Sequence, residues 1–440
     1  RLYNICCGVW KISAYHSIFF IKKYEHDIEK SFMIKLRNRS KEDFQIMLST
    51  DNYTQKLLGL EDVIITKVQR NLNETLIFIE LPKKPHICPY CASITTRINN
   101  YRFQKIKDLP AFMQKTYLLL RKRRYFCSSC NKAFYENNNF ITKYQRMTDR
   151  FTQHILSKLA EMRSYTSIAS ELGCSNTTVI RKANLISYPK AQLPKVLAID
   201  EFKGNTDHEK YQCIITDVAK KQTLDILPNR KVEDLYQYFM SFSKAERDKV
   251  AYIVMDMSTL FRRLAKTCFP NASIVADKFH FIRLVNWALE HTRKSEQKKF
   301  SKQRRIYFKK SRWILTKSFH KLTSEEQLQL LNMISISENI RKAYMLKELF
   351  HNAINSEDIL KNLLIWYEKA KQSGIEKFSK LADTIYSWKN EIIAALNTGF
   401  TNGYTEGCNN RAKVLKRVSF GLRNFNRFRN RLLFIASSKS

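Results

Sequence analysis

The strongest pattern along the chain is an apolar run, Val196–Ile199, that leads directly into two carboxylates, Asp200 and Glu201. A continuous apolar run of this length predicts a strand that is buried on both faces. Its acidic end places negative charge at the rim of a sheet, which is costly unless a positive group such as a metal ion is held there. The alternative interpretation is a strand followed by a solvated turn.

The alternation of apolar strands and amphipathic helices continues beyond this run. Two later strands also end in acidic residues, Asp256 and Asp277. In chain order the pattern predicts three strands, a helix, a strand, a helix, a strand and a helix from near Phe279: Val196–Ile199, Tyr211–Val218, Thr223–Leu227, Val232–Phe242, Val250–Met255, Thr259–Cys268 and Ser273–Ala276. This order predicts a ribonuclease-H-like α/β core with carboxylates at the ends of its first and fourth strands.

Residues 291–400 have the pattern of an all-α segment. Capping-box pairs that begin new helices are Thr323 with Glu326 and Ser335 with Glu338. Its first part, from Arg293 to Lys321, holds twelve Lys and Arg residues and one acid. We predict an α-helical insertion in the core whose basic part is either a DNA-binding surface or a solvated helix face.

A further acidic motif follows at residues 401–419. We predict a helix from Thr405 that carries Glu406, Asn409, Asn410 and Lys413 on one side, because these residues are three or four positions apart. An acid, two amides and a lysine on one stripe suit a metal ion and its nucleic-acid strand. Residues 421–431 then alternate Arg with Phe and Asn, which suits phosphate contacts and base stacking or a helix core.

Before the core, residues 148–182 have a helix-turn-helix pattern. Ile168 and Leu172 face inward, Gly173 turns the chain, and Ser175 caps a second helix with Val179 on its core side. Polar residues near the start of a recognition helix suit base edges and phosphates. We expect DNA contacts from Asn176, Thr177, Arg181 and Lys182, and the alternative is an ordinary helical hairpin.

Two Cys-x-x-Cys pairs precede that segment, Cys88 with Cys91 and Cys127 with Cys130. Each pair directs two thiolates at one point, and tetrahedral zinc needs four ligands. We predict a structural, ribbon-like Zn²⁺ site, with unpaired core cysteines as the alternative. The basic strand between the pairs, residues 117–126, is either a phosphate-contacting strand or a solvated sheet edge.

Charge and composition narrow the partner. The 440 residues include 77 Lys and Arg against 40 Asp and Glu, a net charge of +37. Such an excess indicates nucleic acid, and a membrane surface is less suitable because the basic residues are spread along the whole chain. No apolar run reaches the roughly 18 residues of a membrane-spanning helix, and no signal peptide pattern is present. We therefore expect an intracellular protein.

The three carboxylates Asp200, Asp256 and Glu406 fit one chemistry. Cleavage and transfer of phosphodiesters use two divalent ions roughly 4 Å apart, held by carboxylate oxygens. The phosphate-binding loop of nucleotide-driven motors, GxxxxGK[ST], is absent from the sequence. A metal-dependent nuclease or strand-transfer reaction is therefore favoured over a nucleotide-driven one.

Several motifs together resemble the DDE transposases of the ISL-three insertion-sequence family. They are Ile199-Asp-Glu-Phe, Met255-Asp-Met-Ser, Asp277-Lys-Phe-His280 and Gly403-Tyr-Thr-Glu-Gly-Cys-Asn-Asn-Arg-Ala-Lys, behind a zinc module and a helix-turn-helix. The resemblance implies a ribonuclease-H-like core interrupted before the last Glu, and cleavage and joining of DNA that depends on Mg²⁺ or Mn²⁺. It implies that Asp200, Asp256 and Glu406 form the catalytic triad and bind the magnesium. It also implies a protein of the bacterial cytoplasm that is associated with the nucleoid when active.

The second position of this triad has an alternative in Asp277, which also ends a predicted strand. We prefer Asp256 because the fourth strand neighbours the first in the predicted fold. Asp277 and His280 then resemble the D-x-x-H signature of related transposases and brace the site, with direct metal binding by His280 as the lesser alternative. Glu201 points away from Asp200 if the strand continues.

The predicted domains are a zinc-binding domain over 47–145, a helix-turn-helix over 146–190, a catalytic domain over 191–290 and 401–435, and the insertion over 291–400. The chain begins with Arg, and we expect residues 1–46 to lack order or to precede the true start. The expected partners are the element's terminal inverted repeats and target DNA, with homo-oligomers forming on DNA and no membrane. A catalytically silent DNA-binding regulator and a zinc-ribbon nuclease or RNA-binding protein are the rival functions.

Overall fold

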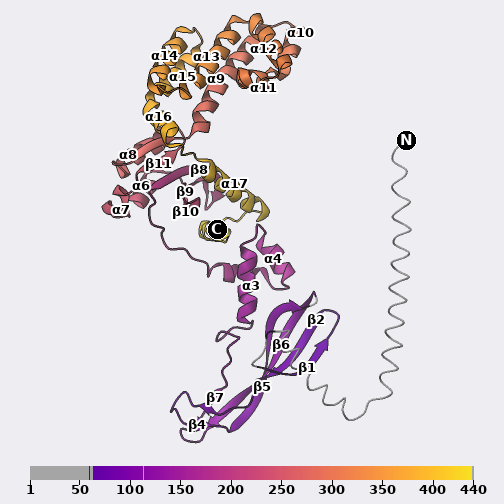
Figure 1. The fold of residues 1–440 in the computed structure, drawn as a ribbon. Coiled ribbons are helices and arrows are strands. Elements are labelled where there is room, and N and C mark those ends of the chain that lie inside the picture. The colour runs from indigo at the N-terminus through magenta and orange to yellow at the C-terminus, as the bar shows by residue number, and fades with distance from the viewer. Residues whose placement is uncertain (1–58, 60–62, 112, 439–440) are drawn as a thin grey trace, which may run out of the picture. The chain divides into compact units, whose positions relative to one another are not determined.

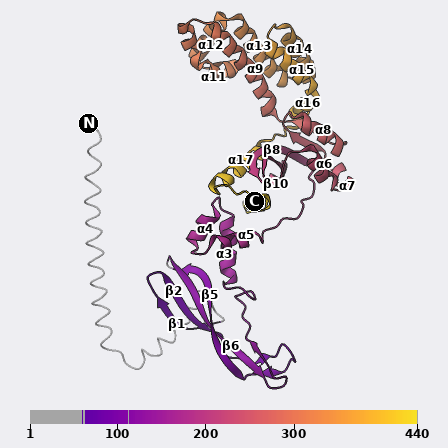
Figure 2. The ribbon, with the colours of Figure 1, turned by 180° about the vertical axis from the view of Figure 1, so that it is seen from behind.

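The computed structural model describes residues 59, 63–111 and 113–438, so the predictions for residues 1–46 lie outside the described part of the chain. The chain divides into two compact units between Gln153 and His154. Figures 1 and 2 show the elements of each unit from opposite sides.

The first unit is built on a five-stranded sheet in the order β1-β2-β6-β5, with β7 also paired to β6. Alternate apolar residues of these strands, such as Ile77, Ile106 and Leu118, form its core. The strand bounds are β1 Ile64–Arg70, β2 Glu74–Glu80, β5 Ile98–Ala111, β6 Gln114–Cys127 and β7 Lys132–Tyr135, and a short pair is formed by β3 His86–Ile87 and β4 Ile94–Thr95.

The basic strand predicted over residues 117–126 is part of β6, which pairs with β2, β5 and β7. The alternative of a solvated edge strand is therefore wrong. Arg123 is 1% exposed and donates to Glu80 Oε2 at 2.9 Å and to Glu136 Oε2 at 3.2 Å. This arginine stabilises the sheet because its buried charge has two carboxylate partners.

Three helices follow: α3 (Asp149–Leu159), α4 (Tyr165–Glu171) and α5 (Asn176–Ala183). Ser164 and Ser175 cap the last two, since each hydroxyl accepts a hydrogen bond from the backbone N–H three residues later. Gly173 has a φ of +58° in the turn between α4 and α5, a conformation that glycine adopts at little cost. The predicted helix-turn-helix arrangement of helices is present.

The second unit contains a five-stranded sheet in the order β10-β9-β8-β11-β12. Its first three strands are antiparallel, whereas β8, β11 and β12 run parallel to one another. The bounds are β8 Val196–Thr206, β9 Glu209–Asp217, β10 Gln222–Leu227, β11 Tyr252–Met255 and β12 Ser273–Ala276. The predicted strand and helix order of this region is observed, with an additional short helix, α7 (Lys244–Asp248), before β11.

Both faces of this sheet are covered, because successive strand residues point to opposite sides. On one face Leu197 and Ile199 pack with residues of α6 (Val232–Met240) and α8 (Thr259–Cys268). On the other, Ala198 packs with α9 (Lys278–Lys299), and Phe202 packs with α17 (Gly403–Val418) and α18 (Phe425–Ser437). α17 lies against β8 in both views (Figures 1 and 2).

The chain between α9 and α17 is helical, as the sequence predicts, but α13 is capped by Ser337 and not by the predicted Ser335. Its core holds large side chains such as Phe350, Trp366 and Trp388. The helices are α10 Lys302–Tyr307, α11 Ser311–Thr316, α12 Ser324–Ile336, α13 Glu338–Ile354, α14 Ile359–Gln372, α15 Glu376–Ser387 and α16 Lys389–Thr398, with short 3₁₀ turns at Phe308–Lys310 and Phe319–Lys321. No helix of the described residues is long and apolar enough to cross a membrane.

Candidate active site

Three carboxylates lie at the carboxyl-terminal end of the parallel pairing in the sheet of the second unit, which we call the carboxylate edge. The predicted end of the first strand at Ile199 is wrong, because β8 continues to Thr206. Asp200 lies in β8, Asp256 follows β11 and Asp277 follows β12. Ala198 is paired with Val254, so Asp200 and Asp256 stand at the same level of neighbouring strands. The Asp277 N–H donates to the Met255 carbonyl at 2.8 Å, which fixes the end of β12 beside the end of β11.

Asp200 is held in a partly buried position by two hydrogen bonds. Its Oδ1 accepts from the Glu201 N–H at 2.8 Å, and its Oδ2 accepts from Asn409 Nδ2, also at 2.8 Å. Burial raises the pKa of Asp200 to about 7, and the negative charges of Asp256, Glu201 and Asp277 act in the same direction. A carboxyl with this pKa is costly to ionise without a cation.

Asp256 has a similar environment. Burial raises the pKa of its carboxyl, whereas the neighbouring His280 and Arg283 lower it. Its Oδ1 is buried and has no hydrogen-bond partner. Asp277 differs, because its Oδ1 accepts from the Asn402 N–H at 3.2 Å and its Oδ2 lies 3.8 Å from His280 Nε2.

Glu201 lies on the opposite face of β8 from Asp200, as the continued strand predicts. Its carboxylate accepts from Arg230 at 2.7 Å. The ion pair links β8 to the loop before α6, on the face of β8 opposite to Asp200. Glu201 is therefore a neighbour of the site that has its own partner.

The predicted stripe on α17 divides into two parts. Glu406, Asn410 and Lys413 are exposed, whereas Asn409 is only 4% exposed and donates to Asp200. The expectation that Asn409 faces DNA is therefore wrong in this structure. The physical reason is the helix period: Thr405, Cys408, Asn409 and Ala412 share the face that packs on the sheet.

The residues at this edge fit a divalent ion by their donor chemistry. Three buried side-chain oxygens, Asp256 Oδ1, Asn402 Oδ1 and Asn409 Oδ1, have no hydrogen-bond partner. Buried polar atoms are rarely left without a partner, and carboxylate and amide oxygens are ligands for Mg²⁺ and Mn²⁺. Glu406 is not brought into a close cluster with Asp200 and Asp256, since within the described chain only a cysteine group has three or more such ligands mutually within 4.8 Å.

Sequence reasoning gave no role to two residues that join α17 to this edge. Asn402 is the N-cap residue of α17, is 3% exposed and contacts Asp277 through its backbone. Thr405 is fully buried and shares a hydrogen bond of 2.8 Å with Thr216 of β9. Their position just before and beside Glu406 was the available signal, but polar residues at a helix start usually indicate only a cap.

The four predicted zinc ligands do come together. The Sγ atoms of Cys88, Cys91, Cys127 and Cys130 all lie within 4.8 Å of one another. Ala92 and Asn131, which follow the second cysteine of each pair, have φ values of +60° and +53°, so both turns curl in the same way. Four sulfurs at this separation fit a closed, structural Zn²⁺ site with no open position for a substrate.

The predicted DNA-contacting residues of the helix-turn-helix are exposed with one exception. Asn176, Thr177 and Arg181 are exposed on α5, but Lys182 is only 9% exposed. The expectation that Lys182 faces outward is wrong, because it lies three residues after Val179 on the buried side of the helix.

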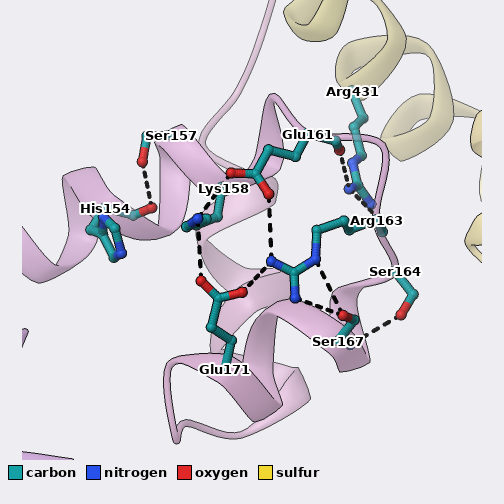
Figure 3. A network of polar contacts seen from close by, with 9 residues as sticks. All are labelled: His154, Ser157, Lys158, Glu161, Arg163, Ser164, Ser167, Glu171 and Arg431. Atoms are coloured by element: carbon teal, nitrogen blue, oxygen red, sulfur yellow. Dashed lines mark hydrogen bonds and ion pairs between the residues drawn. The ribbon is translucent and has the colours of Figure 1, made fainter. Parts of the chain in front are cut away.

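The helix-turn-helix is fastened to α18 by a buried arginine (Figure 3). Arg431 is 1% exposed, and its guanidinium donates to the carbonyls of Leu159 at 3.4 Å, Glu161 at 3.2 Å and Arg163. The same guanidinium lies 4.7 Å from the centre of the Tyr165 ring. Because Phe428 and Leu432 of α18 pack on the sheet, one helix contacts both modules.

Comparison with known proteins gives a consistent result. A family model described as ISL3 "Transposase" matches residues 197–432, and models described as "zinc-finger of transposase IS204/IS1001/IS1096/IS1165" and "Helix-turn-helix domain of transposase family ISL3" match 84–130 and 136–186. The transposase for insertion sequence element IS1001 of Bordetella parapertussis is 25% identical over 368 residues, which cover 79% of this chain and 88% of the relative. The transposase for IS1557 of Mycobacterium tuberculosis is 22% identical over 252 residues, 52% of this chain and 56% of the relative.

Proposed function

The chain belongs to the ISL3 family of transposases, and from this premise we propose that it binds the terminal inverted repeats of its insertion sequence and cuts and joins DNA there with Asp200, Asp256 and Glu406. The observation that carries the proposal is the pair of partly buried carboxylates, Asp200 and Asp256, on neighbouring parallel strands. Burial without an ion-pair partner is the environment expected of carboxylates that bind metal ions.

The catalytic domain is proposed to be ribonuclease-H-like. The sheet order β10-β9-β8-β11-β12, with three antiparallel strands followed by two parallel additions, supports this assignment. The helices α10 to α16 then form the all-α insertion between β12 and α17. This topology is the reason that Asp200 and Glu406 come from segments about 200 residues apart yet belong to one domain.

Asp256 is our choice for the second carboxylate of the triad. Its Oδ1 has no partner, whereas Asp277 is already engaged by the Asn402 N–H and lies near His280. An unpartnered oxygen has a lone pair available for a cation, and an engaged carboxylate is suited to bracing the start of α17. His280 is therefore proposed as a positioning residue beside the site.

Bound divalent ions would activate the attacking hydroxyl and stabilise the leaving oxygen of the phosphodiester. Asp200 and Asp256 would hold them at the carboxylate edge, and Glu406 would supply the third carboxylate from the first turn of α17. Asn409 keeps Asp200 in one orientation through its hydrogen bond. Asn402 and Thr405 hold the start of α17 on the sheet, which limits where the Glu406 side chain can reach.

The amino-terminal modules are proposed to select the DNA ends. Asn176, Thr177 and Arg181 are exposed at and after the start of α5, where base edges and phosphates can be reached. Asn410 and Lys413, exposed on α17, remain candidates for contacts with the DNA strand beside the carboxylate edge. Cutting two element ends together would require two copies of the chain, so we expect homo-oligomers on DNA.

The test is cleavage of duplex DNA that carries the ends of the element, taken from the DNA flanking the gene. We expect Mg²⁺-dependent cutting at those ends by the wild-type chain and none by D200A, with both proteins binding the same DNA. A chain that binds the ends and never cuts them would be a regulator, and the proposed activity would be wrong.

A further inference from the structure

The start of α9 carries exposed aromatic side chains on either side of an arginine. Phe279 is 56% exposed and Trp287 is 52% exposed. The Arg283 guanidinium lies 5.3 Å from the centre of the Phe279 ring and 4.9 Å from that of the Trp287 ring. The spacing of four residues puts all three on one face of the helix, over about 12 Å, and we call them the α9 stripe.

The α9 stripe begins at the carboxylate edge. Asp277 is the N-cap residue of α9, and His280 lies 3.8 Å from its carboxylate. Arg283 donates to His280 Nδ1 at 2.9 Å, while its Nε is buried with no hydrogen-bond partner. The positive charge of Arg283 also acts on Asp256. A ligand that touches the stripe would therefore be next to the carboxylates.

The rings of the stripe are not part of the protein core. The core side of α9 is formed by Phe281, Val285, Ala288 and Leu289, which pack with the other helices. Two large exposed rings beside the carboxylate edge therefore suggest a ligand that has flat, stackable groups. Farther along the helix several exposed side chains are basic, including Lys294 and Lys298.

Charge selects among the possible ligands. A second copy of the chain is a poor occupant, because each copy has a net charge of +37 and the stripe itself is cationic. Nucleic acid supplies what the stripe lacks, since bases stack on aromatic rings and phosphates pair with arginine. A paired duplex hides its base faces, so the flat groups must come from unpaired nucleotides.

We propose that the α9 stripe binds unpaired nucleotides of the DNA strand next to the cleaved phosphodiester, with bases stacked on Phe279 and Trp287 and a backbone phosphate held by Arg283. The inference rests on the proposed function and adds a strand-opening step to it. Base pairs at the element end would be separated before or during cleavage, and the stripe would hold the freed bases. Each stacked base contributes enough to weaken binding about 10- to 100-fold when its ring is removed.

The test combines protein variants with DNA that lacks single bases. Cleavage of an element-end duplex is measured with the full chain, W287A and the conservative variant W287F, and with abasic nucleotides placed in turn beside the cut. Y236A is the matched control, because Tyr236 of α6 is also an exposed aromatic, at 40%, on the opposite face of the sheet. We expect W287A to cut about 10- to 100-fold more slowly and W287F to recover most of the loss.

At one abasic position the wild type and W287A should cut at equal rates, because the base that meets the ring is gone. If W287A lost the same fraction of its cleavage rate on intact and abasic DNA, or lost none on either, the inference would be overturned. R283A should lose one phosphate contact, so the slope of log binding constant against log salt concentration should become shallower by about one. An unchanged salt dependence would show that Arg283 does not contact a phosphate of the DNA backbone.

A second readout separates this inference from the proposed function. 2-Aminopurine, placed in the unpaired end nucleotides of a pre-cut duplex, is quenched when it stacks on a ring. If the wild type never cuts, the proposed activity fails, but quenching by the wild type and its loss in W287A still support the stripe. Unchanged quenching in W287A together with altered self-association would assign the rings to a protein contact and overturn the inference.

Discussion

Asn409 donates a hydrogen bond of 2.8 Å to Asp200 Oδ2, although the two residues are 209 positions apart in the chain. The bond joins α17 to β8, although helices α10 to α16 lie between them in the chain. Because Asn409 lies one turn after Glu406, it also fixes where that carboxylate stands relative to the sheet. The orientation of Asp200 and the placement of Glu406 are therefore linked.

Loss of this hydrogen bond should impair cleavage more than folding. We expect N409A to lower the cleavage rate about 10- to 100-fold, the range found when a partner of a metal ligand is removed. V414A is the control, since Val414 is exposed on the same helix and has no proposed role in the site. Rates are compared on one element-end duplex at several Mg²⁺ concentrations, and equal rates for N409A and wild type would contradict the assigned role.

The raised pKa of Asp200 predicts a cost in stability. The pKa is about 7 in the folded protein and roughly 4 in an unfolded chain, so between these pH values the folded state binds more protons. The contribution of this group to stability therefore falls as the pH rises from about 4 to 7. In metal-free protein we expect D200N to be more stable than wild type at pH 8 by on the order of 2 kcal/mol, and equally stable near pH 4.

Urea unfolding followed at pH 4, 6 and 8 measures this difference. D248N is the control, because Asp248 is exposed at the end of α7. Added Mg²⁺ should stabilise wild type and not D200N, so the difference between their unfolding free energies should become smaller. A D200N protein that is less stable than wild type at pH 8 would show that the ionised Asp200 does not destabilise the folded protein.

The cysteine cluster predicts a chain that carries zinc when purified. We expect one zinc ion per chain, held by Cys88, Cys91, Cys127 and Cys130. C127S should lose the zinc and expose residues 84–130 to proteases, because no other cross-link closes the two turns. C268S changes a buried cysteine outside the cluster and should retain the metal. Full zinc content in C127S would contradict the site.

The buried guanidinium of Arg431 predicts a coupling between α18 and the helix-turn-helix. R431M keeps much of the side-chain volume and removes the hydrogen bonds to Leu159, Glu161 and Arg163. We expect a loss of on the order of 3 kcal/mol in unfolding free energy and weaker binding of element ends. R427A, which removes a half-buried arginine of the same helix and its hydrogen bond to Asn184, should cost less than half as much. A smaller loss in R431M than in R427A would contradict the anchoring role.

The strands, helices and zinc ligands were predictable because their signals are local. Apolar runs, capping serines and Cys-x-x-Cys spacing each depend on a few adjacent residues. The errors concern which side of an element faces the core: Lys182 and Asn409 are buried, and Arg123 lies in an interior strand. A polar residue on a buried face is only explained by its distant partner, such as Asp200 for Asn409, and no local pattern encodes that partner.

The exposed rings of Phe279 and Trp287 show the same limit. In the sequence they are part of an ordinary amphipathic helix, and their exposure beside the carboxylates depends on how α9 packs. Asn402 was missed for a similar reason, because its contact with Asp277 spans 125 residues. Tertiary packing, rather than propensity, determines these positions.

The most direct test of the catalytic assignment is cleavage of an element-end duplex by four proteins: wild type, D200A, D256A and D277A. All four should bind the duplex, and in Mg²⁺ wild type should cut it while D200A and D256A should not. D277A should retain measurable cutting, because Asp277 braces α17 through Asn402. Cutting that survives in D256A and disappears in D277A would contradict the assigned triad.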